Sequence, residues 1–332
     1  MKTPATFSTL MTSLVAFGLC AGLLTGCQTP DLKPFRDSTA QIHDSVVGAK
    51  DIYLEEQQRI EPFLPEGAKA NFEKQINLFQ TNWTARANVM EAMVRYAGSL
   101  AAVADAPEKS KAAMEGVSQS VSEMAVAAGP YAPAVAGAKD IALELVDLAN
   151  RVRAAQQLKQ AVLATDKDMQ RVAQILSADF GIMGQELEDR QESLKNLMDG
   201  PLSDQLHARR QIEKESAILA QKLIENLKTN SLTQAVANFN QDMAEVQKYL
   251  AESDKWYLPH TTEVDQAQKQ LAEHVRLFRD TQTALTQWGK AHAALAKALQ
   301  DGLPPDWTLL EQSAERIKNT INQITKQRNQ QP

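Results

Sequence analysis

The residues that could do chemistry are few and scattered along this 332-residue chain. The five histidines are His43, His207, His260, His274 and His292. None of them forms a His-x-x-x-His or Glu-x-x-His pair of the kind that binds metal inside helical bundles. The sequence has no glycine-rich phosphate loop and no Gly-x-Ser-x-Gly motif. We therefore expect no catalytic residue, no metal site and no cofactor, and we interpret the protein as a non-enzyme.

Both cysteines, Cys20 and Cys27, lie close to the N-terminus. Lys2 precedes an uncharged, largely apolar run, 10–26, whose place and length are typical of a secretory signal peptide. The run ends in Leu24-Thr25-Gly26-Cys27, which resembles the lipobox of bacterial lipoproteins. The resemblance implies that residues 1–26 are a cleaved signal peptide and that Cys27 becomes the lipidated first residue.

The same resemblance implies a cellular location for the mature chain. Several acyl chains on Cys27 would attach the protein stably to a membrane. Gln28 stands where Asp commonly signals retention at the inner membrane, so we expect an outer-membrane lipoprotein whose domain faces the periplasm. Residues 27–36 contain Pro30 and Pro34, and they are interpreted as a short extended tether. The mature chain would then have no thiol and no disulfide, so packing alone must stabilise it.

Composition limits the classes of partner. The formal net charge is −6, with charges of both signs spread along the chain, whereas nucleic-acid-binding proteins usually carry a basic patch. This mixture of positive and negative charges also argues against a polybasic helix on a membrane surface. Hydrophobic residues make up 43% of the chain and aromatic residues only 5%, a composition that suits closely packed helices. We expect no nucleic-acid partner.

Apolar residues recur every three or four positions along almost the whole chain, which predicts amphipathic helices and no strands. From Phe72 to Ala104 this pattern continues for about nine turns. Proline and glycine mark the expected breaks, and the sharpest is Asp199-Gly200-Pro201. We also expect Asp166 and Thr262 to begin helices, and a break near Asn230-Ser231.

The predicted fold is therefore all-α, an elongated antiparallel bundle of about seven or eight long helices. The bundle is expected to cover residues 37–325, with sub-bundles 37–199 and 202–325 as one possible division. The polar tail 326–332 is expected to lie outside it.

One stretch of fifteen residues, 124–138, carries no charge. On one interpretation it is an apolar hairpin tip that contacts a membrane or a partner, loosely similar to the hairpins of helical pore-forming toxins. On the other it is a tightly packed turn in which Val126 and Val135 face neighbouring helices, and this is the interpretation we prefer. The residues that would form the interaction hairpin are Met124, Val126, Gly129, Pro130, Tyr131, Pro133 and Val135.

Two polar residues fall on apolar stripes. His292 follows the spacing of Trp288 and Leu295, and we expect it to be half-buried by packing. Arg190 lies between Leu187 and Leu194, where we expect the guanidinium to reach solvent at the end of the bundle.

These observations favour a lipid-anchored envelope protein whose helical bundle binds a partner protein, as a scaffold, accessory or adaptor. The alternative function is that of a membrane-active or toxin-related lipoprotein, for example an immunity lipoprotein. This alternative is based on the apolar stretch 124–138. The hypothesis of an enzymatic function is supported only by isolated titratable residues.

Overall fold

The protein is described here by a computed structural model, which covers residues 30–64, 66–105, 110–131, 143–149, 152, 158–229 and 231–329. Within these ranges the chain is almost entirely α-helical and contains no β-strand, which confirms the predicted all-α helical bundle. None of the helices described is both long and apolar enough to cross a lipid bilayer.

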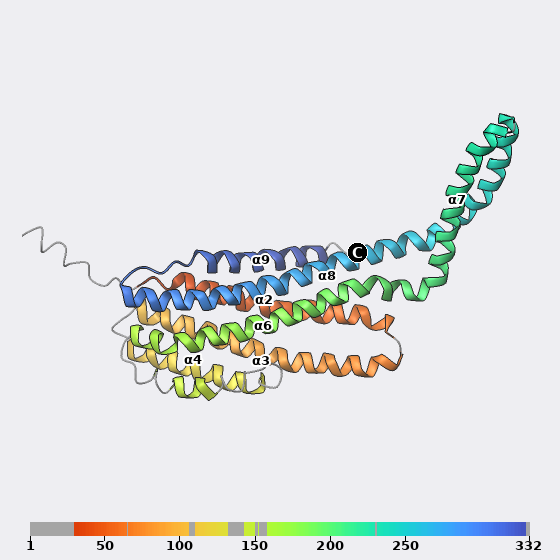
Figure 1. Ribbon diagram of the computed structural model, residues 1–332. Coiled ribbons are helices and arrows are strands. Elements are labelled where there is room, and N and C mark those ends of the chain that lie inside the picture. The colour runs from red at the N-terminus through yellow and green to blue at the C-terminus, as the bar shows by residue number, and fades with distance from the viewer. Residues whose placement is uncertain are drawn as a thin grey trace, which may run out of the picture. The chain divides into compact units, whose positions relative to one another are not determined.

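The helices are coloured along the chain in Figure 1. They are α2 (Lys33–Ile60), α3 (Glu66–Asp105), α4 (Ser110–Tyr131), α6 (Leu158–Asp199), α7 (Ser203–Thr229), α8 (Leu232–Asp301) and α9 (Thr308–Arg328). Two short 3-10 helices, η1 (Glu61–Phe63) and η3 (Gly200–Leu202), follow α2 and α6, and residues 143–149 are also helical.

One predicted helical stretch and two predicted boundaries are confirmed. The apolar stripe from Phe72 to Ala104 lies within α3, and α6 ends at Asp199 as the Asp-Gly-Pro sequence predicts. The break near Asn230-Ser231 separates α7 from α8. Ser231 caps α8, since its carbonyl accepts a hydrogen bond from the Ala235 amide at 3.0 Å and its hydroxyl one from the Gln234 amide at 3.4 Å.

Two predicted helix starts are wrong, because both residues lie inside longer helices. Asp166 is an interior residue of α6, and Thr262 is an interior residue of α8. Helix α8 continues through Pro259, which removes one backbone donor from the ladder. The hydroxyls of Thr261 and Thr262 donate to the Leu258 carbonyl at 3.1 and 2.8 Å, so side chains supply hydrogen bonds to this turn.

The expected extended tether is also wrong in its second half, because α2 begins at Lys33. The Asp31 carboxylate accepts a hydrogen bond from the Lys33 amide at 2.9 Å, and the Asp31 carbonyl accepts one from Trp307 Nε1 at 3.0 Å. Leu32 and Phe35 are fully buried. The two prolines had suggested that this segment is free of the bundle. Burial of Leu32 and Phe35 instead holds it against the core.

The chain divides into two compact units, and each is assembled from three stretches. Unit 1 comprises residues 1–41, 88–175 and 286–314, and unit 2 comprises residues 42–87, 176–285 and 315–332. Gly200 and the helical residues on both sides of it belong to unit 2, so this division does not fall at the strongest turn signal of the sequence.

The core of unit 1 is built around aromatic rings. The ring of Phe35 lies between those of Trp288 and Trp307, with centroid distances of 5.3 and 5.4 Å. Trp288 Nε1 donates a hydrogen bond to the buried Thr39 hydroxyl at 2.9 Å. Three of the large aromatic side chains are therefore buried together in this core.

Unit 2 has its own aromatic core, and this core includes a charge pair. The rings of Trp83, Phe180 and Phe278 lie with centroid distances of 5.8 to 6.3 Å. Beside them Arg86 and Asp179 form a buried bidentate ion pair, in which Arg86 Nη2 donates to Asp179 Oδ1 at 2.9 Å. Two hydrogen bonds in fixed geometry offset part of the cost of burying both charges.

Candidate functional site: the α7–α8 hairpin

A helical hairpin within unit 2 is formed by α7 and the first part of α8, residues 203–260, which lie side by side in Figure 1. The two segments run antiparallel, since the Ser216 hydroxyl contacts Met243 Sδ at 4.0 Å and Arg209 contacts Asp254. The half-buried or buried apolar residues between them recur every three to seven positions: Leu206, Ile212, Leu219 and Leu223 on α7, and Ala235, Phe239, Met243 and Val246 on α8. One narrow stripe on each helix therefore makes the hairpin.

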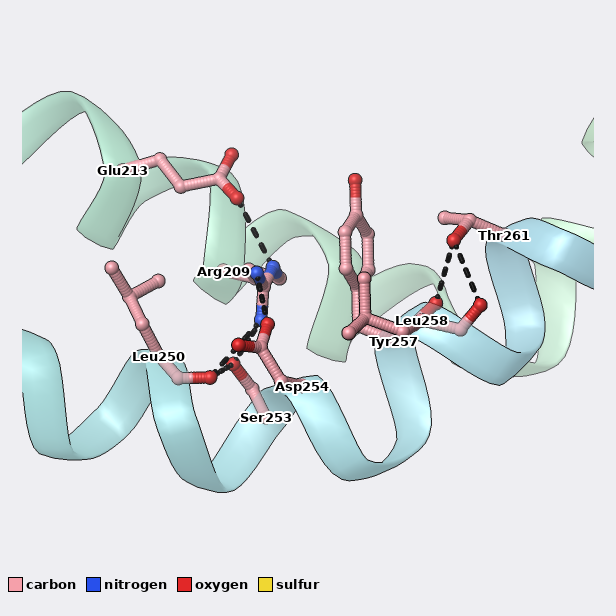
Figure 2. Close-up of polar contacts among 8 residues, drawn as sticks. All are labelled: Arg209, Glu213, Leu250, Ser253, Asp254, Tyr257, Leu258 and Thr261. Carbon is pink, nitrogen blue, oxygen red and sulfur yellow. Dashed lines mark hydrogen bonds and ion pairs between the residues drawn. The ribbon is translucent and has the colours of Figure 1, made fainter.

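A cluster around Arg209 joins the two helices, as Figure 2 shows. Arg209 Nε donates to Glu213 Oε1 at 3.0 Å, and Nη2 donates to Asp254 Oδ1 at 2.6 Å. Nη1 donates to the Ser253 hydroxyl and to the Leu250 carbonyl. We call these residues the Arg209 clamp. It uses the planar fork of a guanidinium, which a lysine ammonium could not reproduce.

The ring of Tyr257 completes the clamp. The guanidinium carbon of Arg209 lies 3.9 Å from the centroid of that ring, close enough for a cation–π interaction. In Figure 2 the Tyr257 ring stands beside Arg209 on the side of α8. The Arg209 side chain is 9% exposed, so its contacts are screened little by water. The clamp thus fixes the register of α7 against α8.

The base of the hairpin is tied by a second polar contact. His260 Nε2 lies 2.8 Å from Asp199 Oδ1, and Lys195 Nζ lies 3.3 Å from Asp199 Oδ2. Burial disfavours the charged form of Asp199, but the hydrogen bonds from His260 and Lys195 outweigh it and lower the pKa of this carboxyl. The last residue of α6 is thereby linked to α8 just after Pro259.

The other end of the hairpin exposes large apolar side chains. Ile224 is 61% exposed and Leu227 is 42% exposed at the end of α7, and Leu232 is 67% and Val236 38% exposed at the start of α8. We call these four residues the apolar tip. They lie within one or two turns of the helix break, where the two chains turn back on each other. Exposed apolar side chains that cluster in this way are typical of interaction sites.

The apolar tip is uncharged on its α8 side, whereas on its α7 side the charged residues Lys222, Glu225 and Lys228 are exposed beside Ile224 and Leu227. From Thr229 to Gln241 the sequence has thirteen residues without a charged side chain, and five of them are asparagine or glutamine. The first charge beyond this stretch is Asp242. A partner would therefore meet apolar and amide groups on the α8 side of the tip, and charges of both signs on its α7 side.

In the described part of the chain, no group of three or more His, Cys, Asp or Glu side chains is placed to hold a metal ion. The donors of Arg209 are directed at residues of the hairpin itself. What this arrangement can do is present exposed apolar side chains at one end of a helical hairpin to another molecule.

The residues predicted from the sequence lie elsewhere. Cys27, Pro133 and Val135 fall outside the described residues. Gly129, Pro130 and Tyr131 form the last positions of α4, so the helix continues through the Gly-Pro pair that was expected to end it. Pro130 supplies no amide donor, so the last turn of α4 has one backbone hydrogen bond fewer.

The packed interpretation of residues 124–138 is wrong at Val126. This side chain is 76% exposed, whereas Met124 is fully buried. The neighbours Ala125, Ala127 and Ala128 are buried as well. Within residues 124–128 Val126 is therefore the one exposed side chain.

Sequence reasoning missed the apolar tip, although it placed the break at Asn230-Ser231. The signal that could have found the tip is the uncharged stretch after the break, which is almost as long as 124–138. Leu232 and Val236 fit the spacing of an apolar helix stripe, and their exposure results from the hairpin ending there. An apolar stripe at the end of a two-helix hairpin has too few neighbours to cover it.

Two further polar residues differ from expectation. His292 is fully buried, not half-buried, and its ring lies against Trp288 and Tyr96 in unit 1. Arg190 is half-buried in unit 2, where Nη1 donates to Gln57 Oε1. Both side chains satisfy neighbouring groups within the fold.

Comparison with known proteins gives no family for this chain. No protein-family model matches it, and neither a curated protein nor a solved structure matches it.

Proposed function

We propose that this protein is a lipid-anchored envelope protein that binds a partner protein through the apolar tip of its α7–α8 hairpin. The proposal makes the chain a non-enzymatic binding module, with Cys27 as the site of the lipid and the outer membrane as its location. The anchor depends on the Leu24-Thr25-Gly26-Cys27 pattern. The binding role depends on the apolar tip.

The single observation that carries the binding role is the exposure of Ile224, Leu227, Leu232 and Val236 at one end of the hairpin. Water must be ordered around these side chains in the free protein, and a partner that covers them gains about 25 cal/mol for each Å² of apolar surface removed from water. The Arg209 clamp supports the same role, because a stiff hairpin loses little conformational freedom when it binds.

The occupant that fits the apolar tip is a protein and not a lipid bilayer. The amide of Gln234 lies within the tip on α8, and those of Asn238, Asn240 and Gln241 follow it directly. Placing such groups in hydrocarbon without hydrogen-bond partners is unfavourable, whereas a protein surface can offer them backbone and side-chain partners. On the α7 side of the tip the exposed Lys222 and Lys228 are accompanied by Glu225, so the tip has no purely basic surface of the kind that favours anionic lipids.

A photo-reactive residue in place of Leu232, introduced into the full chain in living cells, tests the proposal. We expect one crosslinked protein product of defined size, and we expect Val236→Asp to reduce its yield strongly. The matched control is Leu309→Asp, because Leu309 is 60% exposed on α9 in unit 1 and the same charge is introduced there. Crosslinks that are equally abundant in Val236→Asp and in the parent would refute a binding role for the tip.

The anchor is tested separately with Cys27→Ser. Labelled palmitate should enter the parent protein and not the variant, and the variant should accumulate as an uncleaved precursor. Incorporation of palmitate into the variant at the parental level would refute lipidation at Cys27, whatever the hairpin binds.

A further inference from the structure

The α7–α8 hairpin is covalently joined to the rest of the chain at two points. One is the connection from α6 into α7 through η3, and the other is the passage of α8 through Pro259. Residues 203–258 lie between these two points. Any movement of the hairpin as a body must therefore be taken up by the backbone there.

The first point interrupts the helix by its residue types. Asp199 ends α6 and is followed by Gly200 and Pro201 in the three residues of η3. Glycine and proline are the two residues least favourable in the interior of an α-helix. The Ser203 amide donates to the Gly200 carbonyl, which is the hydrogen bond of a 3-10 turn. A short 3-10 stretch between two longer helical segments often marks a hinge.

The second point weakens α8 in a related way. Pro259 has no amide hydrogen, so the Lys255 carbonyl lacks the backbone donor that an α-helix supplies four residues later. The hydroxyls of Thr261 and Thr262 both donate to the Leu258 carbonyl, and hydroxyl bonds of this kind often bend helices. Side chains therefore replace part of the backbone ladder in this turn.

The two interruptions lie side by side. His260 directly follows the proline of α8, and Asp199 directly precedes the glycine of η3. His260 Nε2 lies 2.8 Å from Asp199 Oδ1, and the two side chains are 10% and 16% exposed. A break in one helix alone would be held straight by its neighbour, whereas breaks at the same level let both helices bend together.

The hairpin is stiff directly beside these interruptions. The Arg209 clamp lies about two turns after η3 on α7. Its bond to Asp254 lies five residues before Pro259 on α8. Bending is therefore concentrated at residues 199–202 and 258–262, and the part of the hairpin beyond the clamp moves as one piece.

We propose that residues 199–202 and 258–262 form a hinge on which the α7–α8 hairpin turns as a stiff arm, and that the contact between His260 and Asp199 restrains it. The hinge changes the direction in which the apolar tip is presented. It depends neither on what the tip binds nor on a lipid at Cys27.

Distances between pairs of spin labels, measured by double electron–electron resonance, test the hinge in the full chain with both native cysteines replaced by serine. One pair, at the exposed Gln185 and Lys214, spans the hinge. The control pair, at the exposed Gln205 and Ala237, lies within the hairpin. We expect the distance distribution across the hinge to be about twice as wide as that within the hairpin. Distributions of equal width would overturn the proposal.

The triple variant Gly200→Ala, Pro201→Ala and Pro259→Ala strengthens the helix at both points. A Cβ at Gly200 would meet no atom within 4 Å, and the two proline replacements restore amide donors. We expect the distribution across the hinge to narrow to the width found within the hairpin. A variant as wide as the parent would place the movement elsewhere and would also overturn the proposal.

His260→Ala tests the restraint. It should widen the distribution across the hinge beyond that of the parent, whereas His207→Ala, the same change at an exposed position of α7, should leave it unchanged. An unchanged distribution in His260→Ala would show that the contact with Asp199 does not restrain the hinge. Val236→Asp, the variant that should lose crosslinking at the apolar tip, should keep the parental width, so failure of the hinge is separable from failure of the tip.

Discussion

The hydroxyl of Tyr96 lies 2.7 Å from Nε2 of His292, although the two residues are 196 positions apart in the chain. Both side chains are fully buried in unit 1. His292 Nδ1 lies 3.0 Å from Asp166 Oδ1, and the Tyr96 hydroxyl lies 2.6 Å from Thr165 Oγ1. Four side chains from α3, α6 and α8 therefore form one hydrogen-bonded network.

The network can be satisfied with His292 neutral or protonated. When His292 is neutral, Nδ1–H donates to Asp166, the Tyr96 hydroxyl donates to Nε2, and the Thr165 hydroxyl donates to Tyr96. When His292 is protonated, Nε2–H donates to Tyr96, whose hydroxyl turns to Thr165. The Thr165 hydroxyl then donates to the Ala161 carbonyl, 3.0 Å away. Neither arrangement leaves a polar atom of these side chains unpaired.

We expect Tyr96→Phe to destabilise the protein by about 1–3 kcal/mol, because it leaves His292 Nε2 buried without its partner. Urea unfolding followed by tryptophan fluorescence measures the change, since Trp288 packs against His292. Tyr257→Phe, at a half-buried position of the hairpin, is the control and should stay within about 0.5 kcal/mol. Equal stability of Tyr96→Phe and the parent would contradict the network.

The stability of the protein should fall in acid in part through Asp166. The hydrogen bond from His292 lowers the pKa of this carboxyl, and it outweighs the opposing effect of burial. Since the native state then binds its proton at lower pH than the unfolded chain, the stabilisation is complete above the ordinary Asp pKa of about 3.9 and is lost as pH falls through the lowered native pKa.

Asp166→Asn isolates this contribution. The difference in unfolding free energy between parent and variant should be largest near neutral pH and should shrink as the pH is lowered below about 4. Chemical denaturation at a series of pH values measures it. A difference that grew in acid would have the wrong sign and would exclude the assignment to Asp166.

In unit 2, Arg86→Met should destabilise the protein by roughly 3–5 kcal/mol, because it leaves the buried Asp179 carboxylate without its cation. The double variant Arg86→Met with Asp179→Leu should recover most of this loss, since it removes both charges. Denaturation of the two single variants and the double variant forms a double-mutant cycle. If the double variant is as unstable as the less stable single variant, the loss of stability comes from packing and not from an unpaired charge.

Much of the fold could be predicted because helices leave a local signal. The stripe from Phe72 to Ala104 and the Asp199-Gly200-Pro201 turn depend on residues a few positions apart, and both were placed correctly. The errors at Asp166 and Thr262 have the same origin. Each residue is a good helix start on its own, but packing of the preceding turns extends the helix through it.

The candidate site could not be predicted in the same way, because it depends on contacts between distant residues. Arg209 lies on the apolar side of α7 as a charged residue, and only its partners Ser253 and Asp254 on α8 explain its burial. The exposure of Leu232 likewise results from where its neighbours end. Periodicity indicates which face of a helix is apolar, and it does not indicate whether anything covers that face.

Two neighbouring positions of α4 should respond to the same change in opposite ways. Met124→Asp should destabilise the protein by roughly 3–5 kcal/mol, because Met124 is fully buried and the new charge has no partner there. Val126→Asp should stay within about 0.5 kcal/mol, because Val126 is 76% exposed. Thermal unfolding of both variants beside the parent decides the matter, and a large loss in Val126→Asp would restore the packed interpretation.

Replacement of Arg209 by lysine should loosen the α7–α8 hairpin without unfolding the rest of unit 2. Lysine keeps the charge, but one ammonium cannot bond Glu213 and Asp254 and also lie flat on Tyr257, so we expect a loss of about 1–2 kcal/mol in the local opening free energy. Amide hydrogen exchange over residues 203–260 measures that opening directly, whereas a global unfolding curve would average it with the cores. Arg210→Lys, an exposed neighbour on the same helix, is the matched control. If the apolar tip needs a rigid hairpin in order to bind, Arg209→Lys should also weaken crosslinking through Leu232. Exchange rates equal to those of the parent would show that the Arg209 clamp does not stabilise the hairpin.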